Sequence, residues 1–119
     1  MAGFDRKIYT ATATIANGAS LSGAVDLNNA HLVGIVMPSG WTAASLTFQV
    51  SRDGGVTFAD YYSATAEYEV TTAAASRSIG FAPADFAGVD AIKVRSGTSG
   101  TPVNQGAARV LTLVSRVYA

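Results

Sequence analysis

Apolar and polar residues alternate with a period of two along several short stretches of the chain. In residues 7–15 the tyrosine, the alanines and one isoleucine occupy odd positions, and the threonines occupy even ones. This alternation predicts a strand with one buried face. Residues 31–37 are apolar at both parities and precede Pro38, which indicates a central strand covered on both sides. Residues 46–51 alternate regularly, and the side chains expected to point inward are Leu46, Phe48 and Val50.

Turn-forming residues separate these stretches. Asn17-Gly18 supplies the left-handed backbone angles of a tight turn, so we expect a hairpin between the first strand and residues 21–27. Asp53-Gly54-Gly55 predicts a second hairpin that returns through residues 56–62. Residues 83–88 indicate a helical turn, with proline at the start and glycine at the end. Further strands are expected at residues 67–72, 76–81, 91–95 and 107–118, the last apolar on both faces around Val110 to Val114.

This pattern predicts an all-β fold. Roughly eight or nine short strands, spaced about ten residues apart with almost no helical period, are typical of a sandwich or jelly roll. A chain of 119 residues fits one domain. We therefore expect a single-domain antiparallel β-sandwich, jelly-roll-like, over residues 8–119, preceded by an N-terminal arm at residues 1–7. Residues 96–106 contain three glycines and a proline, and we expect a long mobile loop that makes functional contacts.

The low charge content indicates that this domain contacts other proteins. Only 13% of the residues are charged, against about 25% in typical soluble domains, which suits an interface, although a weakly charged monomer is the alternative. Eight basic residues balance eight acidic ones without clustering, so nucleic acid is not an expected partner. No apolar run approaches the roughly 18 to 20 residues of a membrane span. Asp5, Arg6 and Lys7 stand where a signal peptide needs apolar residues, so export by that route is not expected.

Residues that could perform catalysis or bind a metal are sparse. His31 is the only histidine and the chain has no cysteine, so we expect neither a zinc site nor a common nucleophile arrangement. Glu67 and Glu69 share one face of an expected strand and are interpreted as solvated. Residues 26–29 offer oxygen ligands but too few for a calcium cage, and we interpret them as an Asx-type turn. The sequence therefore predicts a protein that is not an enzyme and binds no cofactor or metal.

Two motifs resemble parts of carbohydrate-related proteins. Residues 51–58 resemble the Asp-box of sialidases and other propellers, a repeated hairpin in which the aspartate bonds within its own turn; here Phe58 replaces the usual tryptophan. A single copy in a chain too short for a propeller indicates a stable hairpin and nothing about glycoside hydrolysis. Residues 32–35, Trp41 and the Ser-x-Asp-Gly hairpin loosely resemble galactose-binding jelly rolls of the discoidin type. The candidates for aromatic sugar platforms are Trp41, Tyr61 and Tyr62.

A larger set of motifs resembles small structural proteins of tailed-bacteriophage virions. The set comprises Leu32-Val33-Gly34-Ile35, Pro38 with Trp41, Leu46-Thr47-Phe48-Gln49, Ser51-x-Asp53-Gly54-Gly55, Pro83-Ala84-Asp85-Phe86-Ala87-Gly88, Ile92-Lys93-Val94-Arg95-Ser96-Gly97 and Pro102-Val103-Asn104-Gln105. The likeness covers roughly residues 20–117. It implies a virion component, without indicating which part of the particle contains it.

With the low charge, this resemblance leads us to expect a capsid decoration, or cement, protein that binds the major capsid protein and stabilises the head. Such a protein is made in the host cytoplasm and ends in the virion, and we expect a homo-oligomer, with a trimer favoured. The alternatives are a neck, tail or fibre-associated virion protein, or a carbohydrate-binding β-sandwich module. The residues expected to contact a partner are Phe4, Trp41, Tyr61, Tyr62, Arg95, Thr98, Pro102, Asn104 and Gln105.

Overall fold

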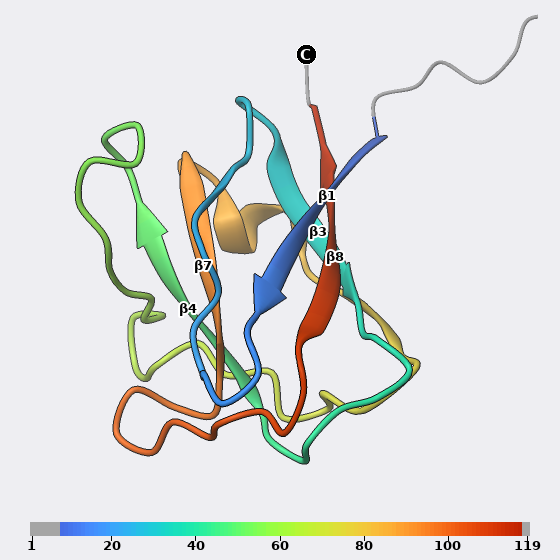
Figure 1. Ribbon diagram of the computed structural model, residues 1–119. Helices are drawn as coiled ribbons and strands as arrows, with labels where there is room; N and C mark the ends of the chain where they lie inside the picture. Colours follow the sequence, from blue (N-terminus) through green and yellow to red (C-terminus); the bar gives the residue numbers. More distant parts are fainter. Residues whose placement is uncertain (1–7, 118–119) are drawn as a thin grey trace, which may run out of the picture.

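Two four-stranded antiparallel sheets lie face to face in the computed structural model, which describes residues 8–117 (Figure 1). The first sheet has the order β1-β8-β3-β6, and the second has the order β2-β7-β4-β5. The strands are β1 (Ile8–Ile15), β2 (Val25–Asp26), β3 (His31–Val36), β4 (Leu46–Ser51), β5 (Ala59–Asp60), β6 (Ser78–Gly80), β7 (Ala91–Ser96) and β8 (Arg109–Arg116). The predicted all-β antiparallel sandwich is confirmed.

The strand pairing is that of a jelly roll. The first strand pairs with the last, β2 pairs with β7, β3 with β6, and β4 with β5, so the chain resembles one long hairpin folded over on itself. Double-sheet folds of this kind occur in viral capsid domains and in lectins alike. The fold is therefore compatible with both a virion protein and a sugar-binding protein.

Alternating side chains of both sheets build the core. β1 and β8 pair residue by residue along their whole length. Their inward residues, which are at most 1% exposed, are Ala13, Ile15, Leu111 and Leu113. From the second sheet, the predicted inward residues of β4 are at most 8% exposed, and they are Leu46, Phe48 and Val50. The sequence prediction for β4 is confirmed in both its bounds and its inward face.

The hairpin predicted at Asn17-Gly18 is wrong in its pairing. Gly18 does adopt a positive φ of 79°, but its amide donates to the carbonyl of Gln105 at 2.8 Å. The chain then crosses to the second sheet, where Leu21 and Val25 lie opposite residues of β7. β1 pairs with β8 instead, at the other end of the chain. The local turn was predictable, whereas the sheet that the next segment joins depends on distant residues.

The segment between β4 and β6 contains less regular structure than the sequence predicts. β4 and β5 form the expected hairpin, but β5 has two residues because residues 52–58 form a wide turn. In place of a strand at residues 67–72, the structure has isolated bridges, Tyr62↔Glu67 and Leu46↔Val70. The helical turn is confirmed as a 3-10 helix, η1 (Pro83–Phe86), which brings the buried ring of Phe86 into the core.

Candidate protein-contact surface

The outer face of the first sheet presents rows of uncharged side chains. Directly paired residues of neighbouring strands point to the same side of a sheet. The outward rows are Thr12-Thr112-Val36-Ser78, Thr10-Val114-Gly34-Gly80 and Thr14-Val110. We call these residues the Thr/Val face. It is built from threonines, valines, glycines and one serine.

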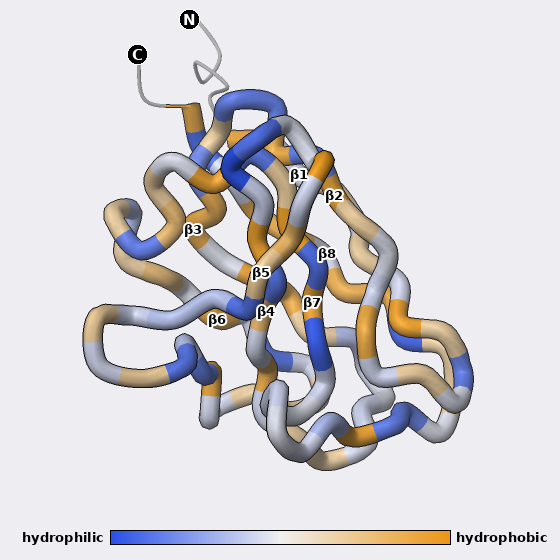
Figure 2. Tube along the Cα trace, turned by 90° about the vertical axis from the view of Figure 1, so that its left-hand side faces the viewer, coloured by the Kyte–Doolittle hydropathy of each residue, from blue (hydrophilic) through white to orange (hydrophobic). Residues whose placement is uncertain are grey.

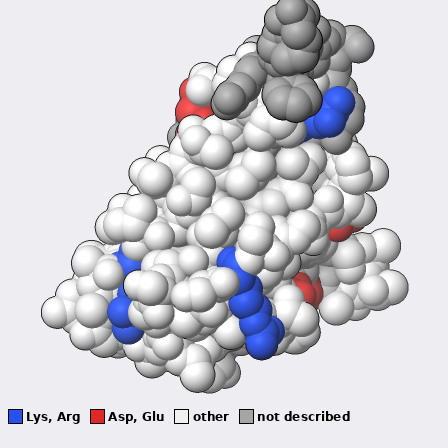
Figure 3. Space-filling view, turned by 90° about the vertical axis from the view of Figure 1, so that its right-hand side faces the viewer, with Lys and Arg blue, Asp and Glu red and all other residues white. Residues whose placement is uncertain are grey.

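The Thr/Val face is open to solvent and almost free of charge. Val110 is 50% exposed and Val36 is 38% exposed. Among the outward residues of the described strands β1, β8, β3 and β6, Arg116 is the only one with a full charge, and it lies with His31 at one end of the sheet. On this side of the molecule a broad area without acidic or basic groups separates basic groups nearer the upper and lower ends (Figure 3).

The outward apolar residues of β3 and β8 correct one expectation. The sequence of β3 predicted a central strand covered on both sides, and that of β8 is apolar on both faces. β3 is indeed interior to its sheet. However, the described residues cover the core side alone, because the outward Val36 and Val110 remain exposed. The strands therefore have apolar residues on both faces, as in a sheet that is covered on both sides, although the described residues cover only one side of this sheet.

The second sheet, whose strands β4, β5 and β7 lie toward the viewer in Figure 2, differs because several of its outward side chains are buried. Thr47 and Ser51 point away from the core, yet they are 0% and 1% exposed. The hydroxyl of Thr47 donates to the carbonyl of Gly97 at 2.7 Å, and that of Ser51 donates to Asp53 Oδ1 at 2.7 Å. The polar groups of this face are thus used within the chain.

Arg95, one of the expected contact residues, is also buried on this sheet. It is 7% exposed, and its guanidinium donates to Asp60 Oδ1 at 2.5 Å and to Glu67 Oε2 at 3.2 Å. The hydrogen bond from Arg95 holds the pKa of Asp60 below its ordinary value. Glu67 also accepts from the amide of Ser99 at 3.2 Å, so this glutamate is part of an ion-pair network and the interpretation of it as solvated is wrong. Arg95 bonds within the chain and presents no surface to a partner.

Gln105, a second expected contact residue, is 1% exposed. Its side-chain carbonyl accepts from the amide of Thr42 at 2.8 Å and from Nε of Arg109 at 3.1 Å. Its amide group donates to the carbonyl of Thr42 at 3.0 Å and to the hydroxyl of Ser96 at 2.7 Å. Gln105 is therefore an internal link between two loops and β8.

The other loop residues predicted to contact a partner lie nearer the surface. Pro102 and Asn104 are exposed, and Thr98 is half-buried. The loop is closed on itself, since Gly97 and Pro102 form a bridge and the amide of Thr101 donates to the Thr98 hydroxyl at 3.0 Å. Phe4 lies outside the described residues.

The three candidate sugar platforms do not form one site. Trp41 is half-buried against the core, and its Nε1 donates to the carbonyl of Ala44 at 3.1 Å. The ring of Tyr61 lies 5.1 Å from that of Phe86, between centroids, and its hydroxyl donates to the carbonyl of Asp85. Tyr62 is 57% exposed, so of these three it alone presents a largely open ring.

The Asp-box-like stretch forms a closed polar turn. Asp53 Oδ2 accepts from the Thr57 hydroxyl at 2.6 Å, and Asp53 Oδ1 accepts from the amides of Val56 and Thr57 at 3.2 and 3.0 Å. Gly54 and Gly55 have positive φ values of 75° and 89°, which L side chains rarely adopt. The hydrogen bonds from Thr57 and Ser51 hold the pKa of Asp53 far below its ordinary value. The aspartate bonds within its own turn, as the resemblance implied.

This geometry gives a pH-dependent prediction for Asp53→Asn. The lowered pKa in the folded state means that ionised Asp53 stabilises the fold above its unfolded-state pKa of about 3.9, and that this stabilisation is lost as the pH falls through the folded-state value. We expect Asp53→Asn to be less stable than the wild type at pH 7, with a smaller difference at pH 3. Urea unfolding at both pH values measures this, and a constant difference would contradict it. Asp26→Asn, in an exposed turn, is the matched control.

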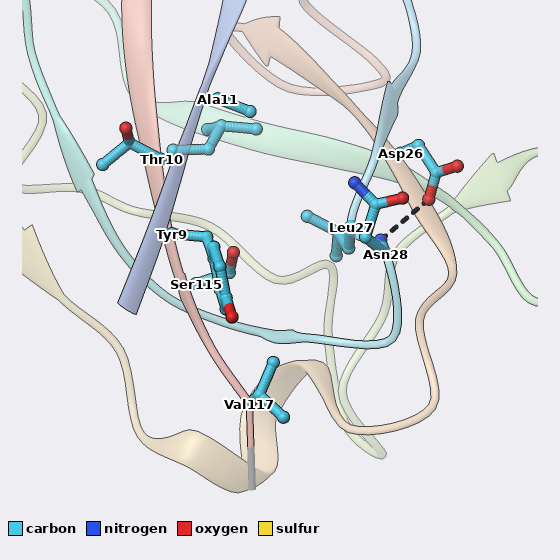
Figure 4. Close-up of a pocket in the computed structure, with 9 residues that line it drawn as sticks. Tyr9, Thr10, Ala11, Asp26, Leu27, Asn28, Ser115 and Val117 are labelled. Atoms are coloured by element: carbon cyan, nitrogen blue, oxygen red, sulfur yellow. Dashed lines mark hydrogen bonds between the residues drawn. The ribbon is translucent and has the colours of Figure 1, made fainter. Parts of the chain in front are cut away.

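A cleft of about 380 Å³ opens between the sheets beside the first half of β1 (Figure 4). Tyr9 and Ala11 line one side with Leu113, and Leu27 lies opposite. Asp26 is the one carboxylate among the described lining residues, and its Oδ1 accepts from the amide of Asn28 at 2.8 Å. This bond is that of the predicted Asx-type turn. The cleft thus offers no pair of carboxylates for acid and base chemistry.

Within residues 8–117, no group of three or more His, Asp or Glu side chains could hold a metal ion. In the same part of the chain, no helix has the length and apolar character needed to cross a membrane.

No family model, curated protein or solved structure matches the chain. The surface itself is therefore the structural basis for a function. The sequence prediction named Phe4 of the N-terminal arm, aromatic residues, Arg95 and the loop at residues 96–106 as contacts, and it did not include the Thr/Val face. Two signals pointed to it, namely the threonines at even positions of β1 and the apolar character of both faces of β8.

Proposed function

We propose that this chain is a structural protein of a tailed-phage particle that decorates the capsid and binds the major capsid protein through its Thr/Val face. The observation that carries the proposal is the exposure of outward valines on β3 and β8, on a sheet face with almost no charge. Interface cores are depleted of charged residues in the same way. The sequence resemblance to virion structural proteins favours a partner within the particle, and the uncharged face leads us to propose the major capsid protein.

In this role the protein acts by binding and not by chemistry. A protein that binds the assembled shell and not the free subunits stabilises the shell by mass action. A face formed by paired strands suits this task, because it buries area against a broad surface without rearranging its own backbone. On the second sheet the outward Thr47, Ser51 and Arg95 are buried within the chain, so the Thr/Val face is the more open side for contact with the capsid.

The test is binding of the purified protein to expanded capsids that lack it. Thr112 lies in the middle row of the Thr/Val face, and Thr112→Lys places a charge inside the proposed contact. We expect roughly tenfold weaker binding, because a buried unpaired charge is costly. Thr71→Lys, which carries the same charge at an exposed turn, should bind like the wild type. Absence of wild-type binding, or equal binding by both variants, would overturn the proposal.

The copy number in purified particles distinguishes the decoration role from the alternative of a neck, tail or fibre protein. A copy number comparable to that of the major capsid protein supports decoration. A few copies per particle would instead assign the chain to the neck, tail or fibres.

A further inference from the structure

β1 leaves a long edge of the first sheet unpaired. Its eight residues pair with β8 on one side, and no strand of the described chain pairs with its other side. The backbone N–H and C=O groups of an edge strand can pair with a strand of another molecule. The other sheet edges are much shorter, since β6 has three residues and β2 and β5 have two each.

β1 also lacks the features by which proteins protect a sheet edge. Such edges usually carry charged side chains, prolines or bulges, or are kept very short. The sequence of β1 is Ile-Tyr-Thr-Ala-Thr-Ala-Thr-Ile, without a charge, proline or glycine. Its register with β8 runs without a shift over all eight residues, whereas β3 and β8 shift at Leu32/Gly34. A regular and uncharged edge of this length is well suited to pairing.

We infer that β1 is a self-association edge, at which two copies of the chain pair β1 with β1 antiparallel about a two-fold axis. The two first sheets then form one continuous sheet of twice the width. A second copy of the chain suits this edge as a partner, because both paired β1 strands would be uncharged and the chain has a formal net charge of zero. Neither local nor overall repulsion opposes the contact.

The two-fold symmetry restricts the register. An axis normal to the sheet places each residue of β1 opposite a residue of the same parity in the other copy. When Thr12 faces Thr12 of the second copy, Thr10 faces Thr14, and these side chains lie on the outer face. Threonine pairs across strands are favourable. The Thr/Val faces of the two copies then become one surface, a consequence that goes beyond the proposed function and does not depend on it.

Analytical ultracentrifugation and native mass spectrometry over a range of protein concentrations test the inference. We expect the mass to rise from 12.2 kDa toward twice that value as the concentration increases. Thr12→Lys puts two lysines near the axis and should weaken the dimer at least roughly tenfold. Hydrogen exchange should slow with concentration at residues 8–15 and not at β6. Thr12 is exposed, so the variant should melt like the wild type.

Thr112→Lys is the matched control, because Thr112 lies directly beside Thr12 in the same row but one strand away from the edge. It should dimerise like the wild type even where it fails to bind capsids, so the two proposals can fail separately. A monomer at all concentrations, a trimer, or equal weakening by the two lysine variants would overturn the β1 pairing. The last result would indicate association through the sheet face.

Discussion

Replacing Phe86 by alanine should lower the free energy of unfolding by about 4 kcal/mol, because the ring is 0% exposed and fills the centre of an aromatic cluster. Its centroid lies 5.3 Å from those of Phe48 and Phe81 and 5.1 Å from those of Tyr61 and Tyr68. The variant loses this buried area and leaves a cavity between η1 and the second sheet. Chemical denaturation measures the loss, and we expect the thermal midpoint to fall by about 15 °C.

The matched control for this prediction is Phe58→Ala. The ring of Phe58 is half-buried at the edge of the Asp53 turn, where the Lys93 ammonium lies 4.5 Å from its centroid. We expect a loss of about 1 kcal/mol from this contact and its partial burial. If Phe86→Ala cost no more than Phe58→Ala, η1 would not be an integral part of the core.

The location of Phe86 shows how far the sequence predicts the fold. The proline and glycine of residues 83–88 predict a local helical turn, and the turn is present. Its role as a core element depends on Tyr61, Tyr68 and Phe81, which come from segments with little regular structure. Tyr68 donates to Asp85 Oδ2 at 2.8 Å, and burial together with this bond raises the pKa of Tyr68 above its ordinary value. Such contacts between irregular segments have no period that a sequence pattern could reveal.

The pairing of strands also depends on contacts between distant parts of the chain. The alternation of apolar and polar residues predicted β4 with its correct bounds, because the inward residues are buried in the core whichever strand is the neighbour. Alternation could not identify β8 as the neighbour of β1, since that choice depends on how the whole chain is folded over. A tight turn such as Asn17-Gly18 serves equally well for a hairpin and for a crossing between two sheets.

The burial of Arg95, one of the candidate contact residues, has a related cause. Arg95 alternates with Ile92 and Val94 in β7, a pattern that indicates a solvent-facing side chain. The structure buries it because Asp60 of β5 and Glu67 of the segment that follows β5 lie against it, 35 and 28 residues away in the chain. The first sheet has no such cover among the described residues, so its outer threonines and valines remain available to a partner.

The burial of Arg95 leads to the second large effect. Arg95→Ala should lower the free energy of unfolding by about 3 kcal/mol at pH 7, because it leaves the carboxylate of Glu67 with 14% of its side chain exposed and no cation beside it. The side chain of Asp60 is 38% exposed, so solvent compensates part of its loss and the value lies at the low end of the range for broken buried pairs.

The pH dependence of this effect has a defined sign. The pKa of Asp60 is lowered in the folded state, so its ion pair stabilises the fold above the unfolded-state pKa of about 3.9 and is lost as the pH falls through the folded-state value. The difference between the wild type and Arg95→Ala should therefore be smaller at pH 3 than at pH 7, as measured by urea denaturation. Arg52→Ala, whose exposed guanidinium donates to the Ala87 carbonyl at 3.3 Å, should cost less than about 1 kcal/mol. Equal losses in the two variants would mean that the network around Arg95 contributes no more than one surface hydrogen bond.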